Sequence, residues 1–434
     1  MNSEVAYSEA FVWVWLPDAV EPVVAGRPTA DGDQLLFNYG QSYLARRDAI
    51  PLYAPELPLQ AGVIPLRAGL NMPACIRDGS PDAWGRRVII NSKFGVKGKQ
   101  ADTAQLDELT YLLESGSDRI GALDFQRSPT EYVPRGAKPV SLEQLVTAAE
   151  SVEQGKPLGP ELDQALRHGT SIGGARPKVQ IEHGDKKYIA KFASTTDLYN
   201  VVKAEFVAMR LAERAGLDVA NVSLTKSLNK DVLLIERFDR KHSPTGWQRK
   251  GLVSALTMLE LDEMMARYAS YQDLAEIIRH RFADAPATLR ELYSRLVFNI
   301  LCGNTDDHAR NHAAFWDGET LRLTPAYDIC PQNRTGHEAS QAMLISGNDR
   351  MSRISSCLNA ASHFLLSRGE AVAIVEDQAT SIIENWDTVC DEAALSAADR
   401  GLLWGRQFLN PFAFEDLNSD AADLKAIADR ARAP

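Results

Sequence analysis

The sequence predicts an α+β fold with a β-rich first part, a middle part of strands and helices, and a mostly helical last part. Three observations predict it. Apolar runs near the start are typical of strands, strand–turn–strand patterns flank a long amphipathic helix between residues 179 and 238, and helical periodicity dominates beyond residue 240. A chain of 434 residues is long enough for about two or three domains.

Composition and charge narrow the class of protein. The chain is 45% hydrophobic and 24% charged, which is ordinary for a folded protein and too apolar for a disordered one. Its net charge of −11 and pI of about 5.3 disfavour binding of nucleic acid through bulk charge, although a local basic patch stays open. Five cysteines without a CxxC pair support neither a zinc ribbon nor a disulfide framework. The early apolar run is far too short to span a bilayer and has no basic flank, so we expect a cytoplasmic protein with no membrane partner.

The first domain is predicted to span residues 8–120. Residues 11–16 form an unbroken apolar run, which suits a strand buried on both faces. Asp31 and Gly32 predict a turn into a second strand over residues 35–39. No recognisable chemistry lies in these strands.

Further along the first domain, the segment SPDAWGRRVI predicts a helix. Ser80 is the expected cap and Pro81 suits the first turn. Residues 125–140 hold three prolines and are predicted to be a linker. Ser141 and Gln144 then have the spacing of a capping box at the start of the next helix.

The second and third domains are predicted to span residues 140–240 and 241–430. Strands are expected at residues 179–182 and 187–192, followed by a helix over residues 197–216. Beyond residue 240 the chain is expected to be mostly helical.

Glu205 lies on the apolar stripe of the helix predicted over residues 197–216. A buried carboxylate without a partner costs several kcal/mol, so Glu205 needs a cation close by. Lys191, on the preceding strand, is the nearest candidate. A strand Lys that pairs with a Glu of the next helix is how protein kinases anchor the phosphates of ATP. A half-exposed Glu205 that reaches solvent is the alternative.

Residues 303–312 (GNTDDHARNH) concentrate polar side chains after an apolar helical segment. Asp306 and Asn311 have the D-x-x-x-x-N spacing of a kinase catalytic loop, where the Asp accepts the substrate hydroxyl proton and the Asn binds Mg²⁺. Two alternatives stay open. His308 and His312 are four apart and suit a metal on one helical face, although the Glu that a metalloprotease motif needs is missing. The second alternative is that the segment is a purely structural polar loop.

Another carboxylate follows this polar segment. Residues 313–323 predict a short β-hairpin that leads into TPAYD, which ends at Asp328. Kinases also follow the catalytic loop with a β-ribbon that presents a second Mg²⁺-binding Asp, although the motif here is Tyr-Asp-Ile instead of Asp-Phe-Gly. Asp328 and Asn311 supply the oxygen ligands that Mg²⁺ prefers.

The segment GTSIGGARPK, residues 169–178, is rich in glycine. Gly173 and Gly174 allow backbone amides to approach phosphates, and Ser171 lies beside them. No Walker sequence is present. Because the segment lies between a helix and the Lys191 strand, it is a plausible loop over ATP. A merely structural loop is the alternative.

With these pieces in order, the chain resembles the HipA family of bacterial serine/threonine kinases, the toxin halves of HipBA-type toxin–antitoxin pairs. The resemblance extends over nearly the whole length. It rests on the β-rich first domain and on SPDAWGRRVI from Ser80, SIGGARPK from Ser171, IERFDR from Ile235, NTDDHARNH from Asn304 and TPAYD from Thr324. The last three, in this order and spacing, are specific to the family. The resemblance implies a protein-kinase-like, two-lobed fold with an additional β-rich N-terminal domain and a mostly helical C-terminal lobe.

The resemblance also implies roles for single residues. Asp306 would be the catalytic base, and Asn311 and Asp328 the Mg²⁺ ligands. Lys191, predicted to pair with Glu205, would hold the α- and β-phosphates of ATP.

Two further segments receive roles in the same way. Glu236, Arg237 and Phe238 would form the hinge that binds adenine through backbone groups. Ser171 matches the family's autophosphorylated serine, whose modification pushes the glycine-rich loop out of the ATP site. A phosphate of charge near −2 beside bound ATP would indeed be repelled.

The family implies a biological role and partners. Such kinases phosphorylate an aminoacyl-tRNA synthetase, typically the glutamyl or tryptophanyl enzyme, so that uncharged tRNA accumulates, growth stops and cells tolerate antibiotics. A HipB-like helix-turn-helix antitoxin binds the toxin and carries it to operator DNA. Two alternatives stay open: a catalytically silent kinase-fold corepressor scaffold, and a metal-dependent hydrolase that uses His308 and His312.

Overall fold

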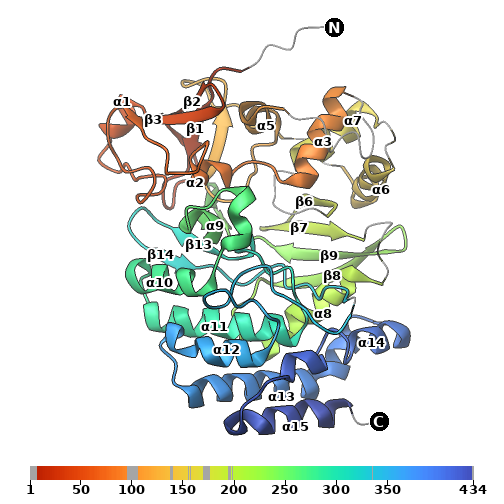
Figure 1. Cartoon of the computed structure of the whole chain (residues 1–434). Helices are drawn as coiled ribbons and strands as arrows, with labels where there is room; N and C mark the ends of the chain where they lie inside the picture. The colour runs from red at the N-terminus through yellow and green to blue at the C-terminus, as the bar shows by residue number, and fades with distance from the viewer. Residues whose placement is uncertain are drawn as a thin grey trace. The chain divides into compact units, whose positions relative to one another are not determined.

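The structure is a computed structural model, and it describes residues 7–94, 106–136, 140–154, 156, 158–169, 176–193, 197, 199–334 and 336–432 (Figure 1). The chain forms two compact units. Unit 1 comprises residues 1–196, 225–253 and 315–319, and unit 2 comprises residues 197–224, 254–314 and 320–434. The domain boundaries 8–120, 140–240 and 241–430 stay a prediction.

Unit 1 contains a five-stranded antiparallel sheet near the N-terminus. Its strands lie in the order β4-β3-β2-β1-β5, with the bounds β1 Phe11–Val14, β2 Val23–Asp31, β3 Gln34–Tyr39, β4 Val63–Ile64 and β5 Leu123–Gln126. The predicted hairpin is confirmed: Asp31 pairs with Gln34, and Gly32 adopts a φ of 58° that favours glycine. Strand β1 is buried on both faces, as predicted, because the neighbouring residues Val12 and Trp13 are both buried.

The helices of this region are α1 Gln41–Leu44, α2 Ala74–Arg77, α3 Ala83–Phe94 and α5 Glu108–Glu114. The start of α3 differs from the prediction. Asp82 precedes the first helical residue, and its Oδ1 accepts a hydrogen bond from the Gly85 amide at 2.8 Å. Ser80 instead donates its hydroxyl to Glu108. The prediction of Ser80 as the cap was wrong, because Asp82 occupies the position whose side chain reaches the first free amides.

A second sheet has the order β6-β7-β9-β8, with the bounds β6 Lys178–His183, β7 Lys186–Phe192, β8 Val222–Ser227 and β9 Lys230–Glu236. Helices α6 Leu142–Glu153 and α7 Pro160–Gly169 precede it. The predicted capping box of Ser141 and Gln144 is confirmed. Trp84 of α3, Leu145 of α6 and Phe192 of β7 belong to one buried core, which joins helices and sheet within unit 1.

Shorter strands complete the sheets. Strands β10 Arg240–Ser243 and β11 Gly246–Arg249 form an antiparallel hairpin. A three-stranded sheet has the order β12-β13-β14, with the bounds β12 Gly251–Ser254, β13 Ala313–Trp316 and β14 Leu321–Leu323. Strands β13 and β14 confirm the hairpin predicted over residues 313–323.

Unit 2 is mostly helical. Its α-helices are α8 Val201–Arg214, α9 Ala255–Met258, α10 Tyr271–Arg281, α11 Ala285–Leu301, α12 Ile354–Ala360, α13 Arg368–Glu392, α14 Ala397–Leu403 and α15 Ala422–Arg432. Its 3₁₀ turns are η1 Glu263–Tyr268, η2 Ala309–Asn311, η3 Ala361–Phe364, η4 Pro411–Phe414 and η5 Ser419–Ala421. Helix α11 packs against α10 and α13, and α13 packs against α8 and α15.

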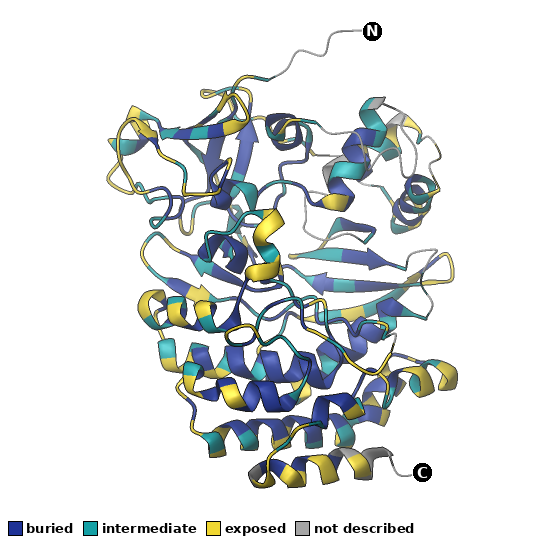
Figure 2. Cartoon of the chain, viewed as in Figure 1, coloured by how far each residue is buried: buried dark blue, intermediate teal, exposed yellow. Residues whose placement is uncertain are grey.

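Burial follows from this packing. Helix α11 is buried along most of its second half, and α13 is buried on the side that faces its neighbours (Figure 2). All five cysteines are buried, and none of them forms a disulfide bond. Within the described ranges, no helix combines the length and the apolar character needed to cross a membrane.

Candidate active site

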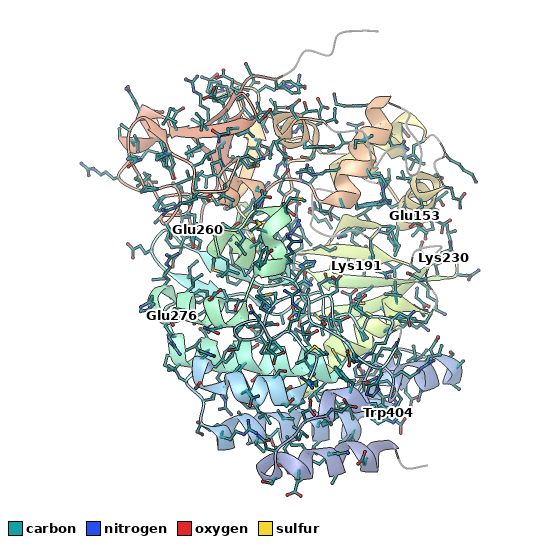
Figure 3. The ribbon with its side chains drawn as sticks, viewed as in Figure 1. Glu153, Lys191, Lys230, Glu260, Glu276 and Trp404 are labelled. Atoms are coloured by element: carbon teal, nitrogen blue, oxygen red, sulfur yellow. The ribbon has the colours of Figure 1, made fainter. Side chains whose placement is uncertain are left out.

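Lys191 lies on β7 in unit 1, at the centre of the four-stranded sheet (Figure 3). It is in register with Leu233 of β9 on one side and Lys178 of β6 on the other. Its side chain is buried. A buried ammonium group is unfavourable without negative charge nearby, so the position suits a lysine that holds an anion or a carboxylate.

Lys178 connects two segments that the family resemblance treats as separate motifs. Its Nζ lies 3.2 Å from the Asp82 carboxylate, with both side chains buried. The indole Nε1 of Trp84 donates to the Lys178 carbonyl at 3.2 Å. The SPDAW segment is therefore fixed to the first strand of the sheet that carries Lys191, a contact between residues almost one hundred positions apart.

The predicted adenine hinge, Glu236 to Phe238, lies at the end of β9. The Glu236 carboxylate pairs with Lys186 at 2.7 Å, and the Phe238 ring packs edge-on against Phe315. The Arg237 amide donates to the Lys187 carbonyl at 2.8 Å. That amide is already used, so backbone contacts to adenine would come from Glu236 and Phe238.

The Arg237 side chain belongs to a charged network with Asp118, Asp239, Arg240 and Arg119. Arg237 donates to both carboxylates at 2.8–3.0 Å, and Arg240 donates to the same two groups at 2.8–3.0 Å. Arg237 and Arg240 also donate to the Arg119 carbonyl. This network was not predicted from the sequence. The alternating charges of IERFDR were the only available signal, and they do not reveal the distant partner.

The charges in this network and its burial shift the pKa values of its members. Burial by itself raises the pKa of Asp239, but Arg237 and Arg240 outweigh burial and lower that pKa to about 2. The same cations hold the pKa of Asp118 well below its usual value against the effect of burial. Burial lowers the pKa of the Arg240 guanidinium to about 10. The carboxylates are therefore ionised at neutral pH and fully engaged in ion pairs.

Helix α8 in unit 2 carries Glu205. The helix begins at Val201, four residues later than predicted, because the Asn200 side chain accepts from the Lys203 amide and caps it. Glu205 is 2% exposed, which confirms that it is buried on the apolar stripe. Its pairing with Lys191 stays a prediction.

Helix α11 delivers the chain to the polar segment 303–312. The Asn304 amide and side chain donate to the carbonyl and side chain of Asn299 at 2.8 and 3.0 Å. Gly303 has a φ of 72°, and a Cβ there would lie 2.8 Å from the Gln407 carbonyl oxygen. The turn that ends α11 therefore requires glycine.

The polar residues of the segment differ in exposure. Asp306 is exposed, whereas Asp307, Asn311 and His312 are buried. The Asn311 Nδ2 donates to the Asp306 carbonyl at 3.3 Å, and the His312 Nε2 lies 2.9 Å from Asp307 Oδ1. The structure thus brings Asp306 and Asn311 together in one short loop and leaves the Asp306 side chain at the surface.

Asp328 follows the β13–β14 hairpin within unit 2. Its φ is 60°, a left-handed conformation that costs a non-glycine residue about 1 kcal/mol or more and is concentrated at functional sites. Ala326, two residues earlier, is held by backbone hydrogen bonds to Asp218 and Ala220 at 2.8 and 2.9 Å. The Tyr327 hydroxyl donates to the Arg310 carbonyl at 2.6 Å. This last bond joins the Asp328 segment to the loop that carries Asp306 and Asn311.

The donor set suits Mg²⁺ better than zinc. As predicted Mg²⁺ ligands, Asn311 would bind the cation through Oδ1, because its Nδ2 is used in a hydrogen bond, and Asp328 would supply carboxylate oxygens. His312 has its Nε2 against Asp307. Among the described residues, no cluster of three or more His, Cys, Asp or Glu side chains has the arrangement of a metal site.

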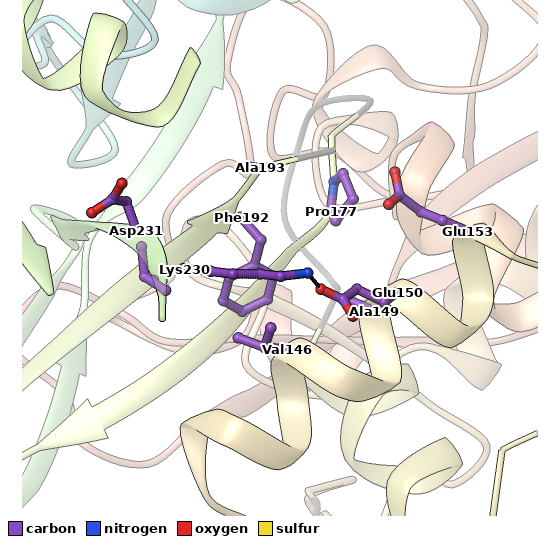
Figure 4. A pocket seen from close by; sticks show the side chains of 10 residues that line it. Val146, Ala149, Glu150, Glu153, Pro177, Phe192, Ala193, Lys230 and Asp231 are labelled. Carbon is purple, nitrogen blue, oxygen red and sulfur yellow. Dashed lines mark ion pairs between the residues drawn. The ribbon is translucent and has the colours of Figure 1, made fainter. Parts of the chain in front are cut away.

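The remaining predicted residues, Ser171, Gly173 and Gly174, lie outside the described residues. Within unit 1, a pocket is lined by Val146, Ala149, Glu150, Glu153, Pro177, Phe192, Ala193, Lys230, Asp231 and Val232 (Figure 4). An ion pair between Lys230 and Glu150 crosses it. None of the predicted site residues that the structure describes is among those that line this pocket.

The structure matches a chain of the complex of HipA, HipB and operator DNA from Shewanella oneidensis MR-1. The TM-score is 0.63 at 18% sequence identity, over 97% of this chain and 95% of that chain. This match confirms the fold class predicted from the sequence, the α+β, protein-kinase-like fold of HipA.

Two family models match the sequence. The HipA N-terminal domain matches residues 14–126, and the HipA-like C-terminal domain matches residues 170–391, which is just over half of the chain. The chain therefore belongs to the HipA family.

Two relatives show how far the similarity extends. The serine/threonine-protein kinase toxin HipA of Shewanella oneidensis is 25% identical over 256 residues, which cover 49% of this chain and 54% of that protein. The protein Y4mE of Sinorhizobium fredii is 28% identical over 277 residues, which cover 56% of this chain and 60% of that protein. The chain thus spans little more than half the length of the curated relatives it matches.

Proposed function

We propose that the chain is an ATP- and Mg²⁺-dependent protein serine/threonine kinase and the toxin of a HipBA-like toxin–antitoxin module. One observation carries the proposal. An exposed Asp306 and a buried Asn311 share one loop, held by an internal Asp307–His312 pair and bonded through Arg310 to the segment of Asp328. Exposure suits a group that meets a protein substrate, and burial suits one that holds a cation in a fixed place.

In this mechanism Asp306 accepts the proton of the acceptor serine hydroxyl. The hydroxyl oxygen then forms a bond to the γ-phosphorus as the bond to the β–γ bridging oxygen breaks, and ADP leaves. The loop contributes mainly by placing the base, which avoids reorganisation in the transition state.

The other predicted residues bind ATP in this proposal. Lys191, buried on β7, holds the α- and β-phosphates and pairs with Glu205. Glu236 and Phe238 bind adenine through backbone groups, since the Arg237 amide is engaged. Asn311 and Asp328 hold Mg²⁺, which neutralises charge on the phosphates when it is bound.

The proposed regulation and partners follow the family resemblance. Ser171, in the loop predicted over ATP, is proposed to be autophosphorylated and thereby to silence the kinase. The proposed substrate is an aminoacyl-tRNA synthetase, and its modification would halt translation and growth. The related Shewanella complex contains HipB and operator DNA, which supports a HipB-like antitoxin that brings this acidic chain to DNA.

The test is phosphate transfer from labelled ATP, measured for the wild type and for the variants Asp306→Gln and Asp328→Asn. We expect both variants to lose transfer by about 10²-fold or more, since each removes a group that acts in the reaction, and to lose growth arrest in the host. Asp273→Gln is the matched control, because Asp273 is an exposed carboxylate on α10 of the same unit. Full activity in either site variant at matched expression contradicts the assignment.

The modified serine and the substrate need separate measurements. Mass spectrometry of the wild type should find phosphate on Ser171, and Ser171→Ala should carry none. Phosphate at another residue refutes the autophosphorylation proposal. Phosphoproteomics after induction should find a modified synthetase in the host.

A further inference from the structure

Three buried polar side chains meet behind the loop that carries Asp306. Asp307 and His312 have side chains about 3% exposed, and Tyr271 is fully buried. His312 Nε2 lies 2.9 Å from Asp307 Oδ1, and the Tyr271 hydroxyl donates to Asp307 Oδ2. The Tyr271 hydroxyl is also 3.2 Å from His312 Nε2, and the two rings pack edge-on. We name these three residues the loop clamp.

The loop clamp holds both ends of the short segment from Asp306 to His312. Asp307 directly follows Asp306, and His312 directly follows Asn311. The Asp307–His312 pair therefore closes the intervening turn from the inside, and the Asn311 amide donates to the His308 carbonyl at 2.8 Å within it. With Asp307 held in the interior, its neighbour Asp306 is turned to the surface.

The clamp is itself anchored to two helices of unit 2. Tyr271 is the first residue of α10, and its amide donates to the Leu344 carbonyl at 2.8 Å. The His312 carbonyl accepts from the Ala255 amide at the start of α9, at 2.7 Å. The two ends of the loop of residues 306–312 are thus held in place by their contacts with α9 and α10.

Stability alone does not explain these polar groups. Burying ionisable side chains incurs a desolvation cost, and well-packed apolar residues of similar volume often give equal or greater stability. What a hydrogen-bonded cluster adds is a defined geometry, and outer groups that orient metal ligands and reacting groups contribute about 10–100-fold to metal affinity or activity.

We propose that Tyr271, Asp307 and His312 are positioning residues for phosphoryl transfer: they hold Asp306 and Asn311 at the separation that the reaction needs. This inference rests on the proposed kinase function and adds three residues to it. The clamp acts through the loop and touches neither ATP nor the acceptor.

The first test compares Tyr271→Phe with Tyr293→Phe in the full chain. Both tyrosines are fully buried in unit 2, but the Tyr293 hydroxyl has no hydrogen-bond partner among the described residues, whereas the Tyr271 hydroxyl binds Asp307. The readouts are kcat, the KM for ATP, the Mg²⁺ concentration for half-maximal rate, and the melting temperature. We expect Tyr271→Phe to lower kcat by about tenfold and to raise the Mg²⁺ requirement severalfold, with little change in the KM for ATP. Tyr293→Phe should leave all three kinetic values within about twofold.

A second test uses rescue at one position. His312→Gln keeps a side chain that is able to hydrogen-bond Asp307, whereas His312→Leu does not. We expect the Gln variant to retain at least tenfold more activity than the Leu variant, with both measured on folded protein. Equal kcat and equal Mg²⁺ requirement for Tyr271→Phe and Tyr293→Phe, or for the two His312 variants, overturn the inference. Absence of transfer in the wild type would instead refute the kinase proposal itself, so the two failures are distinguishable.

Discussion

Two charged segments of this chain, residues 237–240 and residues 306–312, use carboxylates in opposite ways. In the first, Asp239 is buried between two arginines and its ionised form is saturated with hydrogen bonds. In the second, Asp307 is buried against His312 while its neighbour Asp306 is exposed. Charged residues that are close together in the sequence therefore form a structural ion-pair network in one place and a candidate reaction centre in the other.

The comparison separates a carboxylate that stabilises the fold, Asp239, from one that is available for a reaction, Asp306. Loss of the Asp239 carboxylate would leave Arg237 and Arg240 paired with Asp118 but without their second shared carboxylate, so two buried cations would be less well neutralised. An exposed carboxylate at a loop surface contributes little to folding and stays accessible to a substrate.

The largest expected effect separates the two segments directly. Asp239→Asn should lower the free energy of unfolding by about 3 kcal/mol, because it removes one of the two carboxylates that Arg237 and Arg240 share. Asp306→Gln should change the same quantity by less than about 1 kcal/mol while it abolishes transfer. Urea unfolding of both variants measures this. Similar destabilisation by the two substitutions would erase the distinction between the segments.

Acid titration should sharpen the comparison. The pKa of Asp239 is about 2 in the folded protein and near 3.8 when unperturbed, so its contribution to stability is complete above pH 4. That contribution, about 2 kcal/mol, is lost as the pH falls from about 4 to 2. Asp239→Asn should lack this part of the acid sensitivity. If the wild type and the variant show the same slope of stability against pH, the ion pairs of Asp239 are not the cause of this acid sensitivity.

The smallest expected effect concerns an ion pair of unit 1 that solvent reaches. Lys230 and Glu150 pair across the pocket of Figure 4 with partly exposed side chains. Lys230→Gln should change the free energy of unfolding by less than about 1 kcal/mol, because solvent screens the charges. A loss comparable with that of Asp239→Asn would mean that burial does not set the strength of ion pairs in this unit.

Features with a local signal could be predicted from the sequence. The β2–β3 turn, the capping box at Ser141 and the burial of Glu205 each depend on residues a few positions apart, and the structure confirms them. The cap of α3 was assigned to Ser80 instead of Asp82 because both residues are good caps and only the helix start decides between them.

Contacts between distant segments could not be predicted. Asp118 and Arg237 are 119 positions apart, and no periodicity or motif indicates that they meet. The same holds for Tyr271 and Asp307, since nothing in the order of residues shows that the first residue of a helix lies behind the loop. The spacing of residues along the sequence identified the candidate site residues. Tertiary packing, which the sequence does not show, decides which of them are buried.

The turn at Gly303 has a consequence for shortened forms of the chain. The Gln407 backbone lies against this glycine, and the Leu409 amide donates to the Leu301 carbonyl at 2.8 Å. A premature stop codon before Gln407 would remove these contacts with the turn that leads into the candidate catalytic loop, even though every motif residue would still be translated. Nonsense alleles as late as the codon for residue 400 should therefore behave as complete losses of function.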